Sequence, residues 1–394
     1  MNSTKRNVAL LAACQALLFT NNSTLIAING LAGLALAPYI GLATLPVTCW
    51  VLGGAIGTMP ASLHMKRVGR QRGLTTGTLW GIVGALICAS AIWAQSFWLL
   101  CFGTLVFGVY NAYGQYYRFA AADVATGDFK AVAISLVLAG GLVGGILGPT
   151  SSRWTIGLLG PKFMAAYLVL IGFAFVTMVL LRYIRIPTPT AAEQSATGRP
   201  LREIAAQPKF IVAVLAGAIG YGVMNFLMTS TPIAMQVCGH PYSDAAFVIS
   251  SHIIGMFAPS FFTGQLIRRL GVLPVMAAGV LCNFGAIGIA LSGVAVSQFW
   301  FSLVLLGVGW NFLYLGGTTL LTETYRPEER ARAQGTNEQA IFIMMAVSSF
   351  TSGMTVTTAG WERVNLLALP LIAVVGVALV WYALRNRAQR AAAA

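Results

Sequence analysis

Two pairs of soft metal ligands are the most chemically specific feature of the sequence. Met224 and Met228 are four residues apart, and so are His252 and Met256. In a helix, this spacing places both members of a pair on one face. Thioether and imidazole groups together suit Cu(I), whereas Mg²⁺, Ca²⁺ or Mn²⁺ prefer oxygen ligands. The four residues therefore predict a copper site, in which His252 alone could couple metal release to a proton.

The same residues have a second interpretation. Methionine fills gaps in apolar helices, and with 13 Met in the chain one Met-x-x-x-Met pair is unremarkable. A histidine inside an apolar segment is rarer, but it can serve only to hydrogen-bond a neighbouring helix. Spacing alone supports metal binding and packing about equally.

A second set of candidate residues is polar and aromatic. Such residues lie inside apolar segments near positions 21, 111 and 310. They would suit a flat organic molecule, because rings stack on it and amides hydrogen-bond to it. Hydrogen bonding between helices explains the same residues, and we favour that interpretation slightly. The set comprises Asn21, Asn22, Asn111, Tyr113, Tyr117, Trp310, Asn311 and Tyr314.

The composition indicates a membrane protein. Of 394 residues, 57% are hydrophobic and only 9% are charged, where soluble domains carry about 25%. So few charges cannot cover the surface of a soluble protein of this length, which excludes a soluble enzyme and a disordered chain. The net charge of +14 does not imply a nucleic-acid partner, because a basic excess in an apolar chain usually sets membrane orientation.

Apolar segments of about 20 residues, the length that crosses a bilayer, recur along the chain. The twelve predicted spans are 8–30, 41–63, 74–94, 98–120, 131–152, 162–184, 209–232, 243–267, 272–292, 297–321, 336–358 and 364–385. A polar stretch separates the first six from the last six. We expect an all-α membrane protein of two pseudo-symmetric six-helix bundles, at 1–184 and 209–394, joined by a cytoplasmic linker at 185–208.

Sequence similarity between the halves supports this division. Phe97-Trp98 and Phe299-Trp300 open the fourth and tenth spans, and the offset between them is 202 residues. The basic turns at Lys66-Arg67 and Arg268-Arg269 have the same offset. A shared offset at two places indicates a duplicated six-helix unit.

The positions of the charged residues predict the orientation. With the N-terminus inside, 21 Lys and Arg lie on the cytoplasmic side and 3 outside, so both termini are expected in the cytoplasm. All ten acidic residues fall near span ends or in loops, and Glu323 and Glu338 come closest to entering a span. Because no carboxylate and no Lys or Arg lies in mid-span, the cavity serves neither an organic cation nor an anion well.

The basic turns after the second and eighth spans resemble the loop motif G-x-x-x-D-R-x-G-R-R of the major facilitator superfamily. The resemblance implies alternating access, with substrate bound near mid-membrane. The acidic position of the motif is Lys66 in the first half and Arg268 in the second. The usual charge relay of the family therefore cannot operate. The basic residues are either topology signals or partners of Asp123, Asp128, Glu323 or Glu328.

Within that superfamily, intact M-x-x-x-M and H-x-x-x-M pairs in the seventh and eighth spans resemble the CcoA-like copper importers. The resemblance implies copper import through the bacterial inner membrane for cbb3-type oxidase assembly, with a periplasmic copper donor and a cytoplasmic acceptor. It also implies thiols near the outer face. Cys49 and Cys238 stand at matching places, either to capture copper or to form a reversible disulfide at the gate.

Two transport hypotheses follow. The first is a copper importer that binds its ion at Met224, Met228, His252 and Met256. The alternative is uptake of a small aromatic solute such as riboflavin, with which related branches of the superfamily are associated. No nucleophile–base constellation or cofactor loop is evident, so we expect no enzyme activity and no prosthetic group. We expect a monomer in membrane lipid that binds no nucleic acid.

Overall fold

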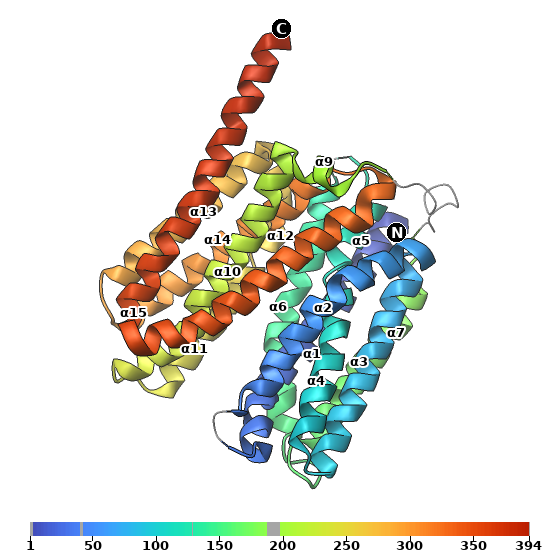
Figure 1. Cartoon of the computed structure of the whole chain (residues 1–394), viewed down its shortest axis with the longest axis vertical. Helices are drawn as coiled ribbons and strands as arrows, with labels where there is room; N and C mark the ends of the chain where they lie inside the picture. The colour runs from blue at the N-terminus through green and yellow to red at the C-terminus, as the bar shows by residue number, and fades with distance from the viewer. Residues whose placement is uncertain (1–2, 40–41, 128, 187–197, 394) are drawn as a thin grey trace. The chain divides into compact units, whose positions relative to one another are not determined.

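Helices make up most of the part of the chain that the structure describes. The computed structural model describes residues 3–39, 42–127, 129–186 and 198–393, and all regular elements in these ranges are helices (Figure 1). This confirms the predicted all-α fold class. Of the linker predicted at 185–208, residues 187–197 lie outside the described residues.

The helices follow the predicted spans closely. The first part of the chain forms α1 (Ser3–Leu36), α2 (Leu45–Val68), α3 (Arg70–Trp93), α4 (Phe97–Gly114), α5 (Tyr117–Val124), α6 (Phe129–Thr155) and α7 (Met164–Arg182). The second part forms α9 (Leu201–Ala205), α10 (Pro208–Val237), α11 (Tyr242–Phe257), α12 (Ser260–Leu270), α13 (Val272–Leu291), α14 (Val296–Leu321), the 3-10 turn η2 (Pro327–Glu329) and α15 (Arg330–Ala393).

Among the described residues, ten helical segments are long and apolar enough to cross a membrane. Helices α4 and α5 form one of these segments, and α11 and α12 form another. Helix α2 occupies the predicted second span but falls outside this set. The eleventh and twelfth predicted spans both lie in α15, whose helical backbone is interrupted at Gly360 (φ 78°), a conformation that glycine adopts without strain. Figure 1 shows the two arms of α15 meeting at a bend.

The described chain divides into two compact units. Unit 1 takes the described residues within Met1–Gly127, Leu136–Ala196 and Gln334–Gln339. Unit 2 takes those within Asp128–Ser135, Thr197–Ala333 and Ala340–Ala394. The start of α6 therefore belongs to unit 2, and a short segment near the start of α15 belongs to unit 1.

Close approach between helices holds each unit together. In unit 1, a Cβ at Gly53 of α2 would lie 1.9 Å from the carbonyl oxygen of Leu105 in α4, so only glycine fits where these helices touch. In unit 2, α14 packs against α10, α11 and α13. A Cβ at Gly307 of α14 would lie 2.7 Å from the carbonyl oxygen of His252 in α11. The backbones of α11 and α14 therefore meet beside one of the predicted ligands.

Candidate functional site

Four aromatic rings from three helices meet in unit 2, and we call them the aromatic cluster: Tyr221, Phe257, Trp310 and Tyr314. The rings of Trp310 and Tyr314 are stacked, with centroids 4.7 Å apart and planes 18° from parallel. Tyr221 of α10 presents its ring edge-on to both, at 5.6 Å. Phe257, the last residue of α11, meets Trp310 edge-on at 5.7 Å. The cluster joins all three helices around the face of α14.

Trp310 is the buried centre of this cluster. Its side chain is 1% exposed, and its Nε1 has no hydrogen-bond partner among the described residues. A buried indole N–H normally donates a hydrogen bond. The cluster therefore combines a stacked ring surface with a donor that a bound carbonyl or ring nitrogen could satisfy.

His252, the predicted metal ligand, lies fully buried on α11. Its Nδ1 lies 2.6 Å from the carbonyl oxygen of Leu303 in α14. Because a carbonyl only accepts, Nδ1 carries the proton of this bond. In the neutral ring Nε2 then holds the free lone pair, and it has no partner among the described residues. This nitrogen could accept a hydrogen bond or bind a metal.

The three predicted methionine ligands lie in the same unit as His252. Met224 and Met256 are buried, and Met228 is partly exposed. The α10 residue next to Met224, Asn225, donates hydrogen bonds to the Ser348 and Ser349 hydroxyls of α15 at 2.9 and 2.8 Å. Within the described residues, no group of three or more His, Cys, Asp or Glu could hold a metal ion. A copper site would therefore depend on thioethers around the one imidazole.

The two predicted thiols lie in different units. Cys49 of α2 is half-buried, and Cys101 of α4 is a neighbouring thiol. Cys238 directly follows the last residue of α10 and is exposed. All six cysteines are free thiols. Of the two, Cys238 is the one whose exposure suits contact with a solute outside the helices.

A chain of buried hydrogen bonds runs through unit 1, and we call it the polar chain: Asn22, Asn111, Gln115, Arg118 and Glu338. The Asn22 amide donates to Asn111 Oδ1 at 2.8 Å, and the Gln115 amide donates to the same oxygen at 3.2 Å. Arg118 donates to Gln115 Oε1 at 3.2 Å and to Glu338 Oε1 at 2.5 Å. Amides from α1 and α4 are thus linked to an ion pair between α5 and α15.

The ion pair of the polar chain is fully buried. The side chains of Arg118 and Glu338 are 2% and 1% exposed. Arg118 is one of the 21 basic residues expected on the cytoplasmic side, and here it is buried in an ion pair. Glu338 was expected to come close to entering a span, and it lies inside the packed unit.

Several buried acceptor atoms in and beside the polar chain have no hydrogen-bond partner among the described residues. Among the described residues, Oδ1 of Asn21, Oδ1 of Asn22 and Oε2 of Glu338 have no hydrogen-bond partner. The Asn21 amide faces the Tyr110 hydroxyl at 3.4 Å. These open oxygens could accept hydrogen bonds from hydroxyl or N–H groups of a solute.

A second ion pair lies in the same unit. Arg70 Nε lies 2.9 Å from Asp123 Oδ2, so one basic residue of the first turn motif does pair with one of the acids named for it. Arg70 also hydrogen-bonds Gln334, and its guanidinium lies 5.6 Å from the centre of the Tyr116 ring. Together with Arg118, it holds the Gln334–Gln339 segment of α15 in unit 1.

Three of the candidate cavity residues are packed inside their units. The Asn311 amide donates to the Met256 carbonyl and to Ser260 Oγ at 2.7 and 2.6 Å, which links α14 to α11 and α12. The Tyr113 ring meets His64 edge-on at 6.1 Å, and Tyr117 is buried. Asn311 and Tyr113 thus contact neighbouring helices, as the helix–helix interpretation expects.

Sequence reasoning missed four residues of the two clusters as site residues: Arg118, Glu338, Tyr221 and Phe257. A signal for Arg118 was present, because Asn111, Gln115 and Arg118 have the spacing i, i+4, i+7 that shares one helix face. The partner Glu338 has no comparable signal, since it lies 220 positions from Arg118 along the chain.

Comparison with known proteins identifies the family to which this architecture belongs. Residues 10–335 match the family described as the Major Facilitator Superfamily. The riboflavin transporter RfnT of Brucella anthropi is 42% identical over 382 residues, which is 95% of each chain. An uncharacterised transporter of the same superfamily from Bacillus subtilis, YddS, is 28% identical over 86% of this chain and 82% of its own.

Solved structures share the fold. The transporter FucP in its outward conformation aligns with a TM-score of 0.81 and 16% identity, over 96% of this chain and 99% of its own. A bacterial homologue of the iron transporter ferroportin aligns with a TM-score of 0.74 and 12% identity, over the same shares. At such low sequence identities, these two similarities are evidence for the fold alone.

The family match, the relative and the apolar helices together define an integral membrane protein of the secondary transporter class. The chain belongs to the Major Facilitator Superfamily.

Proposed function

We propose that the chain takes up riboflavin, or a flat aromatic solute of the same chemistry. The observation that carries this proposal is the 42% identity to a riboflavin transporter over 95% of both chains. The aromatic cluster of unit 2 supports it, because a planar ring system gains its binding energy from stacking on aromatic side chains.

The open polar atoms also suit this class of solute. Riboflavin combines a flat ring system bearing carbonyls and ring nitrogens with a polyol side chain. The Trp310 indole N–H would serve the carbonyls or ring nitrogens. The open oxygens of Asn21 and Asn22 in unit 1 would accept hydrogen bonds from hydroxyl groups. Each set of contacts is proposed separately, and each can be tested by its own variant.

The test is uptake of radiolabelled riboflavin by cells that neither make nor import it. We expect uptake with the wild-type chain and a severalfold loss with Trp310→Phe, which keeps a ring but removes the open N–H. Trp361→Phe is the matched control, because the Trp361 indole already donates to the Ala290 carbonyl at 3.2 Å. The control should lower protein stability and leave uptake per molecule unchanged. Absence of riboflavin uptake by the wild-type chain would overturn the proposal.

Copper import is a second candidate, supported by one observation. The buried Nε2 of His252 has no partner among the described residues. Met256 lies four residues further along α11, on the same helix face. We would measure radioactive copper uptake for the wild type, Met228→Ala and His252→Ala. Copper uptake that survives both substitutions would rule out the metal site. Riboflavin uptake that survives both would show that riboflavin transport does not depend on these two residues.

Several finer expectations stay predictions. The inner-membrane location, the cytoplasmic termini and the monomeric state follow from the sequence arguments above. Reporter fusions at each terminus would test the orientation. The role of Cys238 is tested by Cys238→Ser, which should slow copper uptake without preventing folding if that thiol captures the metal.

A further inference from the structure

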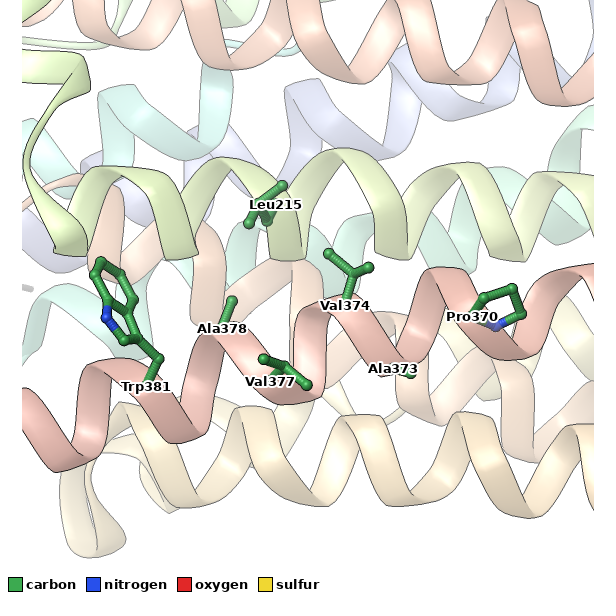
Figure 2. Close-up of a pocket in the computed structure, with 7 residues that line it drawn as sticks. All are labelled: Leu215, Pro370, Ala373, Val374, Val377, Ala378 and Trp381. Atoms are coloured by element: carbon green, nitrogen blue, oxygen red, sulfur yellow. The ribbon is translucent and has the colours of Figure 1, made fainter.

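Two grooves flank the last part of α15, and both lie within unit 2. One, of about 460 Å³, runs between α10 and α15 and is lined by Leu215, by Pro370 and aliphatic residues of α15, and by Trp381 (Figure 2). The other, of about 390 Å³, runs between α13 and α15. Val377 and Val380 on this part of α15 are 69% and 59% exposed. In an integral membrane protein, such exposed aliphatic surface faces lipid.

The α13–α15 groove has an apolar body and a polar end. Its apolar lining comprises Leu273, Pro274, Ala277, Leu379, Val380 and Ala383. Asn386 and Arg387 line the same groove one turn further along α15. From Leu379 to Arg387 the helix rises about 12 Å, so a hydrocarbon chain can lie along the body while a charged group meets the end.

Positive charge gathers around this end of the groove. The exposed Arg268 and Arg269 form the last turn of α12, and Leu273 follows within five residues. Helix α13 begins at Val272, so its first turn presents backbone N–H groups and the positive end of its dipole there. The sequence has no Asp or Glu between Asp244 and Glu323, and none after Glu362. Neither α13 nor the part of α15 after Glu362 therefore supplies a carboxylate to neutralise these cations.

We propose that the α13–α15 groove binds an anionic glycerophospholipid. One acyl chain lies along the apolar body, and the phosphate accepts hydrogen bonds from the Arg387 guanidinium and the Asn386 amide. Basic pockets between membrane helices are a recurrent site for anionic headgroups, and guanidinium matches phosphate geometry. A zwitterionic headgroup is served less well, because neither α13 nor the part of α15 after Glu362 has a carboxylate to pair with its cation. This site is independent of the transported solute.

The neighbouring α10–α15 groove provides the internal comparison. Two cations on the helices of this groove are already engaged. The Arg385 guanidinium lies 5.9 Å from the centre of the Trp381 ring, and Lys209 lies 2.8 Å from a Glu323 carboxylate oxygen. No charged side chain lines this groove. It should therefore contact hydrocarbon without selecting a headgroup.

The experiment is native mass spectrometry of the full-length protein titrated with phosphatidylglycerol and with phosphatidylcholine of the same acyl chains. We expect the wild type to prefer phosphatidylglycerol, and Arg387→Gln to reduce that preference about fivefold, the effect of one basic residue at a membrane surface. Arg182→Gln is the matched control, because Arg182 is an exposed arginine in the last turn of α7, and it should leave the preference unchanged.

Substitutions within the grooves test the acyl chain. Ala383→Leu should weaken retention of phosphatidylglycerol by filling the groove, while Ala373→Leu in the α10–α15 groove should not. Melting temperatures equal to that of the wild type in lipid-free detergent would show that the variants are folded. A variant that melts at a lower temperature is replaced by the smaller change Ala→Val at the same position. The proposal is overturned if the wild type shows no headgroup preference, if Arg387→Gln keeps it, or if filling the α13–α15 groove leaves retention unchanged.

Discussion

The polar chain of unit 1 and the aromatic cluster of unit 2 are both buried between helices, but their chemistry is opposite. The polar chain joins amides to the Arg118–Glu338 ion pair and leaves acceptor oxygens open. The aromatic cluster joins rings and leaves the donor N–H of Trp310 open. A buried charge is costly unless it keeps its partner, whereas a ring that loses a neighbour loses only contact area. The polar chain should therefore affect stability most, and the aromatic cluster should affect solute binding most.

The strongest test of this difference is the buried ion pair. Glu338→Ala leaves the Arg118 guanidinium buried and without its carboxylate, and should cost about 3–5 kcal/mol of unfolding free energy. Thermal or denaturant unfolding in a fixed detergent measures the loss. The control is Glu323→Ala, because the Lys209–Glu323 pair is 33% and 48% exposed, and exposed pairs contribute at most about 1 kcal/mol.

A double variant distinguishes the pair from simple packing. Arg118→Met with Glu338→Met removes both charges and keeps apolar volume, so it should recover most of the stability lost by either single change. If Glu338→Ala costs no more than Glu323→Ala, the polar chain does not hold unit 1 together and the comparison fails.

The fold was largely predictable because its cause is local. Spans of about 20 apolar residues are a requirement of the bilayer, and the predicted spans coincide with the helices found. The gap predicted between 358 and 364 is instead a bend within α15, because Gly360 can adopt positive φ while the flanking residues stay helical. The membership of Gln334–Gln339 in unit 1 depends on contacts distant in sequence, which hydropathy does not report.

The site was predictable only in part, for a related reason. Four-residue spacing correctly puts Trp310 and Tyr314 on one face of α14, where they stack. It also puts His252 and Met256 on one face of α11, but it does not fix how α10 and α11 are rotated against α14. Whether thioethers and imidazole meet depends on that rotation. In the structure the Nδ1 of His252 meets the Leu303 carbonyl, and its Nε2 has no partner among the described residues.

A smaller effect is expected at Asn311, a candidate cavity residue that hydrogen-bonds residues of two neighbouring helices. Asn311→Leu removes hydrogen bonds to Met256 and Ser260 and should cost about 1–2 kcal/mol of stability. Riboflavin uptake per folded molecule should stay unchanged. A large loss of uptake with normal stability would return Asn311 to the solute-binding residues and contradict the helix–helix assignment.

The smallest change concerns a single ring of the aromatic cluster. Tyr314→Leu removes the ring stacked on Trp310 and should weaken riboflavin binding by about 0.5–1.5 kcal/mol, which raises the KM for uptake about two- to tenfold. Phe247→Leu is the matched control, since Phe247 also stacks on a tryptophan, Trp300, with planes 6° from parallel, but is 57% exposed and lies outside the cluster. The same rise in KM for both variants would mean that ring stacking in unit 2 affects the solute only through general packing. A rise in KM confined to Tyr314→Leu would place the solute's ring at the aromatic cluster.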